Sequence, residues 1–302
     1  MRLAVIDIGT NTILMLIAEV SSGQLPMILR DEHSIARLGK GVDKTRRISD
    51  AAYKRFAEII RRYNALITEC NVSRVIAFAT SAMRDAENRD DIIRRTKDEL
   101  RIDIEILSGD DEARWSFQGA LFGIPSSELN GVIATLDIGG GSTEISVGEN
   151  GIYKRGSSVD IGAVRIKERF LAHSSGQEIA RSFIREQLPS IVPISPRSLI
   201  AVAGTPTSLA AMKHRLTHFD TNIVDGTIIH RDELQAMLEE MFSISAEELV
   251  RRYPAVSPAR ADILPAGALI LDEAMLLLKL EEARVSTKGV RYGILLREIE
   301  RM

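Results

Sequence analysis

A short phrase that joins an acidic residue to a glycine-rich turn occurs twice in this chain. Residues 3–12 read LAVIDIGTNT, and residues 132–144 read VIATLDIGGGSTE. An apolar run that glycine interrupts and that then resumes is typical of a β-hairpin. Glycine at the bend lets backbone N–H groups turn inward, and concave clusters of N–H groups bind anions. Two such hairpins facing each other would hold a phosphate chain and its metal ion from both sides.

Three carboxylates accompany these turns: Asp7, Asp137 and Glu144. A single Asp in such a place commonly bonds nearby backbone N–H groups of the turn. Two in matching contexts, with Glu144 soon after the second, favour a Mg²⁺ site. Mg²⁺ usually keeps several waters and takes only one or two carboxylates together with substrate phosphate. We therefore expect Asp137 and Glu144 to hold the metal, with Asp7 next.

The glycines and hydroxyl side chains of the turns are the expected phosphate contacts. Three consecutive glycines exceed what a tight hairpin needs, so close approach to phosphate explains them better than a flexible turn. A third anion site is expected where a strand gives way to a helix near residue 204, because a helix N-terminus favours negative charge. The phosphate-binding residues predicted at these three places are Thr10, Asn11, Thr12, Gly139, Gly140, Gly141, Ser142, Thr143, Gly204 and Thr205.

The elements that carry these residues alternate between strand and helix, which is typical of α/β layers. Hydrophobic periodicity predicts three strands in 2–38 and further strands at 74–79, 103–107, 132–138, 143–149, 152–158, 198–203 and 284–286. Helices are expected after Ser49 and Asp160 as capping residues, at 89–100, 109–122 and 259–280, and from Tyr292. The repeated phrase predicts two similar domains, 1–124 and 125–302, with a cleft between them. The final helix could pack back on the first domain.

Composition excludes several other classes of protein. A net charge of −3 argues against a general nucleic-acid-binding surface. The apolar stretches are too short to span a membrane, and no N-terminal signal is visible. The single cysteine, Cys70, excludes an internal disulfide and fits a reducing cytoplasm. The histidines show no metal-ligand spacing and are expected at the surface; they are His33, His173, His214, His218 and His230.

Several segments together resemble the exopolyphosphatase/guanosine pentaphosphate phosphohydrolase (Ppx/GppA phosphatase) family. They are 7–12 (DIGTNT), 37–39 (RLG), 79–88 (ATSAMRDAEN), 107–114 (LSGDDEAR), 137–144 (DIGGGSTE), 162–165 (GAVR), 203–205 (AGT), 260–262 (RAD) and 289–293 (GVRYG). They follow the family's order over nearly the whole chain. The resemblance implies two ribonuclease H-like domains of the actin, sugar-kinase and Hsp70 ATPase superfamily. It also implies Mg²⁺-dependent removal of the terminal phosphate of polyphosphate, or of the 5′ γ-phosphate of guanosine pentaphosphate.

The resemblance also assigns roles to side chains. On position alone, Glu112 is an acidic residue in the first turn of a helix, where it complements the helix dipole. The family's catalytic glutamate falls on Glu112, which makes it the expected base that activates water. Asp111 stands where the family usually has Glu. Arg84, in the matching 79–88 segment, is expected to bind phosphate, and Arg37 is a weaker candidate of the same kind. Arg291 lies in the matching 289–293 segment and could equally be a salt-bridge partner at a helix end.

Other readings stay open. The chain lacks the extra helical domains of longer family members, so short polyphosphate is the expected preference, and segment 224–226 reads Val-Asp-Gly where Val-His-Gly is usual. One alternative is an ATP-dependent phosphotransferase of the same superfamily. Another is a non-catalytic sensor of nucleotide or polyphosphate. The sequence does not rank polyphosphate against guanosine pentaphosphate, and it leaves a homodimer open.

Overall fold

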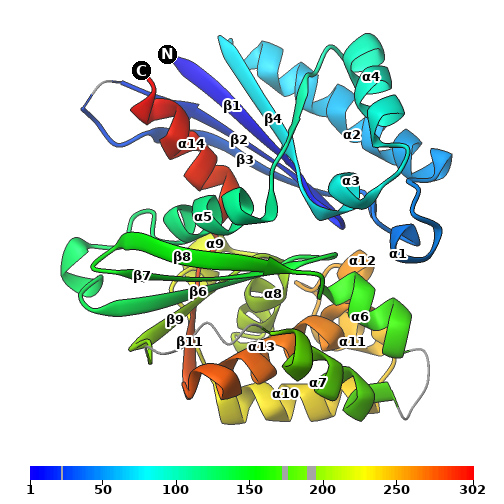
Figure 1. Ribbon diagram of the computed structural model, residues 1–302, viewed down its shortest axis with the longest axis vertical. Coiled ribbons are helices and arrows are strands. Elements are labelled where there is room, and N and C mark those ends of the chain that lie inside the picture. The colour runs from blue at the N-terminus through cyan, green and yellow to red at the C-terminus, as the bar shows by residue number, and fades with distance from the viewer. Residues whose placement is uncertain (22, 172–175, 189–194) are drawn as a thin grey trace.

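The computed structural model describes residues 1–302 except 22, 172–175 and 189–194, so the expectation for His173 lies outside the described residues. The molecule has two lobes, each built on a mixed β-sheet with helices packed against it (Figure 1). No helix in the described part is both long and apolar enough to cross a membrane. The α/β fold with two lobes agrees with the expected fold class.

The sheet of the N-terminal lobe has the strand order β3-β2-β1-β4-β5. Its strands are β1 (Arg2–Ile8), β2 (Thr12–Glu19), β3 (Met27–Ile35), β4 (Arg74–Ala79) and β5 (Ile104–Ile106). The helices of this lobe are α1 (Val42–Thr45), α2 (Asp50–Glu69), α3 (Ser81–Asp85) and α4 (Arg89–Leu100). The side chain of Ser49 accepts a hydrogen bond from the Ala52 N–H, which confirms the predicted cap of α2.

The sheet of the C-terminal lobe has the order β10-β11-β9-β6-β7-β8. Its strands are β6 (Val132–Ile138), β7 (Thr143–Glu149), β8 (Ile152–Val159), β9 (Ser198–Val202), β10 (Ile228–His230) and β11 (Glu282–Val285). Its helices are α6 (Ala163–Phe170), α7 (Gly176–Gln187), α8 (Gly204–Lys213), α9 (Thr221–Val224), α10 (Arg231–Ser243), α11 (Ala246–Arg252), α12 (Pro258–Ala261) and α13 (Leu264–Leu278).

Two helices lie between the sheets: α5 (Gly109–Ala120) and the final helix α14 (Val290–Glu300) (Figure 1). They cross closely because glycines face backbone at the contact. A Cβ on Gly293 would lie 1.9 Å from the Trp115 carbonyl oxygen, and one on Gly119 would lie 2.0 Å from that of Gly289. Helix α5 also packs on β7 and β8, whereas α14 packs on β1 and β2. The predicted division between residues 124 and 125 falls after α5, before the short 3₁₀ helix η1 (Ser126–Glu128), and stays a prediction.

Two local predictions were wrong. The helix expected over 259–280 is broken into α12 and α13, because Pro265 in the first turn of α13 cannot donate a backbone hydrogen bond to a preceding turn. Asp160 does not cap the next helix, because α6 begins only at Ala163 and its N-cap is Gly162. The first N–H groups of α6 bond instead to carbonyls of the 139–142 turn.

Candidate active site

A cleft of about 440 Å³ lies between the two lobes. Its walls come from both hairpin turns, the start of α5, the N-terminus of α8, α12 and the start of α14. Most of the predicted site residues line this cleft, although they come from distant parts of the chain. They are Asp7, Thr10, Asn11, Thr12, Glu112, Asp137, Gly139, Gly140, Ser142, Gly204 and Thr205.

The two hairpins have the same local construction. Gly9 N–H donates to the Thr12 carbonyl and Gly139 N–H to the Ser142 carbonyl, both at 3.0 Å. In each hairpin the Asp is on the strand that enters the turn. The cross-strand partners differ: Asp137 pairs with Glu144, whereas Asp7 pairs with Leu14. Cross-strand partners lie side by side on one face of a sheet, so the second hairpin contributes two carboxylates and the first only one.

Four predicted residues take other places. Thr143 is fully buried and donates its hydroxyl to the Ile161 carbonyl. Glu144 accepts a hydrogen bond from Ser158 of β8 at 2.6 Å and is buried behind the cleft wall. Gly141 lines a small neighbouring cavity, and Arg84 donates a hydrogen bond to Glu112.

Gly140 and Gly141 make the lobes fit together. A Cβ on Gly141 would lie 2.4 Å from the Ser81 hydroxyl oxygen and 2.9 Å from that of Thr10, which both belong to the N-terminal lobe. A Cβ on Gly140 would lie 3.1 Å from Thr10 side-chain carbons. Contact between the lobes therefore requires part of the glycine run, besides the close approach to phosphate that the sequence predicts.

Glu112 is placed by the first turn of α5, which Ser108 caps by accepting a hydrogen bond from the Asp111 N–H. Its carboxylate accepts a hydrogen bond from Arg84 Nη1 at 3.0 Å, and the same nitrogen donates to the Leu107 carbonyl. Arg84 therefore orients the predicted base in this structure. Burial raises the pKa of Glu112 to about 7, against the opposing charge of Arg84 and with the charge of Asp137 adding to the rise.

The pKa values of the other three predicted carboxylates, Asp7, Asp137 and Glu144, are raised as well. Burial, followed by the charges of Glu112 and Asp137, raises the pKa of Asp7 well above its usual range. Burial also raises the pKa of Asp137, although hydrogen bonding by Ser116 opposes the rise. Burial, followed by the charges of Glu112 and Asp137, raises the pKa of Glu144 well above its usual range. The site therefore concentrates more negative charge than Arg84 and Arg291 offset.

This excess of buried negative charge fits a bound cation. Among the described residues, no group of three or more Asp, Glu, His or Cys side chains is placed so that together they could hold a metal ion. Mg²⁺ does not need one, since it usually keeps waters and takes few protein ligands. Asp7 and Asp137 both line the cleft and would be the two carboxylates of such a site, whereas Glu144 lies behind the wall and accepts a hydrogen bond from Ser158.

Sequence reasoning did not select Arg260 of α12 as a site residue, although segment 260–262 belongs to the resemblance. Its guanidinium lies against Gly204, where a Cβ would come within 1.5 Å of Nη1. It donates to Thr12 Oγ1 at 3.2 Å and to His33 Nε2 at 3.1 Å. No carboxylate among the described residues pairs with it, and burial lowers its pKa to about 10. A buried cation without a carboxylate partner, beside the N-terminus of α8, has the charge and the position that suit an anion.

Three further residues complete the cleft. His33 lines it, and the pKa of its ring falls to about 4, because water is displaced around the ring and because Arg260 and Arg291 are charged. Arg291 also lines the cleft, and its ion pair with Asp31 at 2.9 Å agrees with its alternative interpretation as a salt-bridge partner at a helix end. Ser116 donates to Asp137 Oδ2 at 2.5 Å. Ser116 follows Glu112 by one helical turn, a spacing that could have revealed it.

Two α/β lobes that each present an Asp-bearing hairpin to a shared cleft define the class of actin-like ATPase folds. The chain belongs to the Ppx/GppA phosphatase family, whose sequence profile it matches over residues 16–302. Both findings confirm the resemblance and the fold class expected from the sequence.

Individual relatives agree with this assignment. The chain is 34% identical to exopolyphosphatase 2 of Mycobacterium tuberculosis over 98% of each protein. It is 28% identical to exopolyphosphatase 1 of Mycobacterium bovis, over 99% of this chain and 89% of that protein. An exopolyphosphatase from Cytophaga hutchinsonii superimposes with a TM-score of 0.91 at 26% identity, over 100% and 99% of the two chains. An Aquifex aeolicus member of the Ppx/GppA family superimposes with a TM-score of 0.83 at 27% identity, over 100% of this chain and 98% of that chain.

Proposed function

We propose that this protein is a Mg²⁺-dependent exopolyphosphatase that releases orthophosphate from the end of inorganic polyphosphate. The observation that carries the proposal is the buried Glu112 carboxylate, which lines a cleft together with both hairpin turns. Relatives named exopolyphosphatases match almost the entire chain. Together these findings support terminal phosphoanhydride hydrolysis as the reaction.

Different residues of the cleft have different roles in such a reaction. With a pKa near 7, Glu112 can take a proton from a water molecule at neutral pH, and Arg84 holds its carboxylate in place. The hairpin turns and the N-terminus of α8, with Arg260, supply N–H groups and positive charge to the phosphates. Positioning and electrostatic stabilisation supply most of the rate in phosphoryl transfer.

Mg²⁺ is part of the proposal. Asp137 and Asp7 line the cleft and would hold the ion. Glu144, the cross-strand partner of Asp137, would add negative charge from behind the cleft wall. A bound Mg²⁺ ion neutralises phosphate charge and orients the group that is transferred.

The test is phosphate release by the purified protein with Mg²⁺, for tripolyphosphate and long polyphosphate, beside the variant Glu112→Gln. Release from polyphosphate by the parent, reduced at least 100-fold in Glu112→Gln, is the expected result. A folded protein that binds tripolyphosphate but releases no phosphate would overturn the proposal and favour a sensor. Phosphate that passes from ATP to an acceptor, rather than to water, would favour a phosphotransferase.

Guanosine pentaphosphate is the second candidate substrate, because one part of the cleft is apolar. Phe219 lines the cleft and is half exposed, and Ala255 and Ile263 also contribute to the lining. An exposed aromatic ring in a cleft can stack on a nucleobase. If guanosine pentaphosphate is the substrate, Phe219→Ala raises its KM without changing the KM for tripolyphosphate. Equal effects on both substrates would remove this candidate.

A further inference from the structure

The turn between β6 and β7 is anchored by the beginning of α6. The N–H of Ala163 donates to the Gly139 carbonyl and the N–H of Val164 to the Gly140 carbonyl, both at 2.9 Å. The third carbonyl, that of Gly141, accepts a hydrogen bond from Arg165 Nε at 2.8 Å. Three consecutive carbonyls of the turn therefore point toward α6.

This arrangement decides where the N–H groups of the turn point. In a trans peptide unit the N–H is directed opposite to the C=O. The N–H groups of Gly140, Gly141 and Ser142 are therefore directed away from α6, and none of them donates a hydrogen bond within the described part of the chain. Gly140 and Ser142 line the cleft. Consecutive free N–H groups of this kind form an anion-binding nest.

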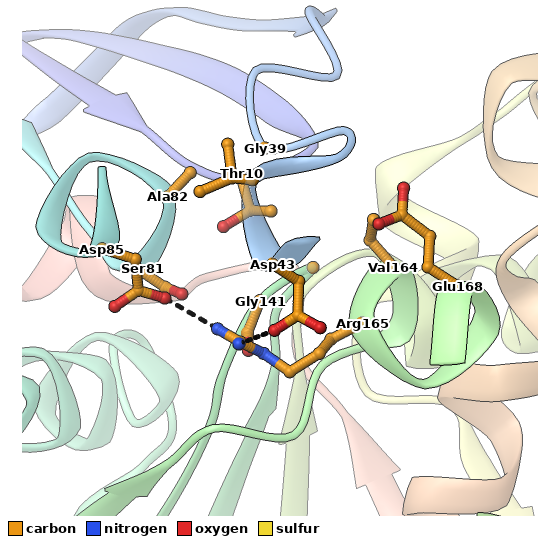
Figure 2. Close-up of a pocket in the computed structure, with 12 residues that line it drawn as sticks. Thr10, Gly39, Asp43, Ser81, Ala82, Asp85, Gly141, Val164, Arg165 and Glu168 are labelled. Carbon is orange, nitrogen blue, oxygen red and sulfur yellow. Dashed lines mark hydrogen bonds and ion pairs between the residues drawn. The ribbon is translucent and has the colours of Figure 1, made fainter. Parts of the chain in front are cut away.

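Arg165 holds the last peptide of this nest and also reaches the other lobe. Figure 2 shows its guanidinium between Asp43 of α1 and Asp85 of α3, beside Gly141. Nη2 donates to Asp85 Oδ2 at 2.7 Å, and Nη1 donates to Asp43. The side chain of Arg165 is only 7% exposed, so each of its three nitrogens has an acceptor away from bulk water. The two carboxylates belong to the N-terminal lobe, whereas the Gly141 carbonyl belongs to the C-terminal lobe.

We propose that Arg165 is a positioning residue that couples closure of the lobes to the order of the phosphate-binding turn. Only in the closed arrangement do Asp43 and Asp85 satisfy the guanidinium while its Nε holds the Gly141 carbonyl. When the lobes separate, the guanidinium loses two carboxylate partners and returns to water, and the Gly141 peptide loses its fixed orientation. This inference rests on the proposed function for the identity of the anion as the end of a polyphosphate chain.

The first test measures binding rather than turnover, with tripolyphosphate as the probe in calorimetry. In Arg165→Met the Kd is expected to rise at least tenfold. The matched control is Arg169→Met, because Arg169 lies on the same helix and pairs with Asp43 at 2.6 Å without bonding to the turn. Its Kd should stay within twofold of the parent. Equal effects of the two variants would overturn the proposal.

The second test measures the distance between the lobes. Asp85→Asn weakens the contact with the other lobe and changes neither partner of the Arg165–Gly141 bond. Spin labels at Glu58→Cys of α2 and Glu239→Cys of α10, both exposed, report the distance after Cys70 is replaced by Ser. The distance distribution is expected to broaden to longer values in Asp85→Asn, and tripolyphosphate should restore the parent distribution. An unchanged distribution together with an unchanged Kd would refute the coupling.

These readouts separate this inference from the proposed function. If the parent releases no phosphate from any substrate but Arg165→Met weakens tripolyphosphate binding and Asp85→Asn separates the lobes, the hydrolase proposal fails and the coupling stands. If the parent releases phosphate and neither variant changes the Kd or the distance between the lobes, the hydrolase proposal stands and the coupling fails. Should Arg165→Met not fold, Arg165→Lys provides the binding measurement. Its ammonium keeps the charge but cannot reach all three acceptors at once, so a Kd raised at least threefold supports the coupling and a parental Kd refutes it.

Discussion

Replacing Glu112 with Gln should make the protein more stable at high pH even as it removes the activity. Glu112 is only 7% exposed, and its carboxylate interacts with the charges of Asp137, Asp7 and Glu144. Gln has nearly the same shape and can still accept the hydrogen bond from Arg84, but it carries no charge. The comparison therefore isolates the cost of keeping this carboxylate ionised inside the cleft.

The size of the effect follows from the pKa. The value rises from the usual 4.5 to about 7 in the folded protein. Since one pKa unit corresponds to about 1.4 kcal/mol, ionised Glu112 lowers the free energy of unfolding by about 3 kcal/mol at pH 8. The sign is fixed by linkage: between pH 4.5 and 7 the unfolded chain releases the proton first, so the stability of the parent falls as pH rises through this window.

The assay is urea unfolding at several pH values from 4.5 to 8, with EDTA present so that no divalent cation offsets the charge. Glu112→Gln and the parent should agree near pH 4.5, and the variant should gain up to about 3 kcal/mol by pH 8. Asp110→Asn is the control, because Asp110 is an exposed carboxylate on the same helix, and its effect should stay within about 0.5 kcal/mol. Parallel pH profiles for Glu112→Gln and the parent would refute the reasoning.

Three further substitutions test other contacts. Gly141→Ala should lower the free energy of unfolding by about 1–3 kcal/mol, since its Cβ would meet the Ser81 hydroxyl, and Ser81→Ala in the same chain should recover part of the loss; urea unfolding that shows no loss would remove the packing argument. Ser116→Ala leaves Asp137 without its hydroxyl donor, so kcat should fall by about tenfold with unchanged circular dichroism, which corresponds to about 1.4 kcal/mol. Arg260→Met should raise the KM for tripolyphosphate at least tenfold and increase the melting temperature, because the buried guanidinium has no carboxylate partner; a lower melting temperature with an unchanged KM would contradict its role in binding anions.

The local parts of the site could be predicted from the sequence, because their causes are local. The glycine turns, the Asp before each turn and the Ser49 cap depend on neighbouring residues alone. The α/β class followed from the alternation of strands and helices, and the two similar domains from the repeated phrase. The ribonuclease H-like fold of each domain followed from the resemblance to the Ppx/GppA phosphatase family.

The partners of the predicted residues could not be foreseen, since they depend on packing between distant segments. Arg84 is 28 positions from Glu112, and Arg260 is 248 positions from Thr12. Nothing in the immediate context of Arg84 indicates that a carboxylate, rather than phosphate alone, would meet its guanidinium. The packing role of Gly141 likewise appears only when Ser81 of the other lobe is placed beside it.

The position of α14 has a consequence for synthesis of the chain on the ribosome. This last helix supplies Val290, Ile294 and Leu295 to the core that covers Leu3 and Leu16 of the first sheet. At about 5–20 residues per second, roughly 15–60 s separate the emergence of the first strands from that of the helix that covers them. One face of the N-terminal lobe therefore stays open to water, or to a chaperone, until α14 has emerged from the ribosome. Emergence of α14 is the event that covers this face of the first sheet.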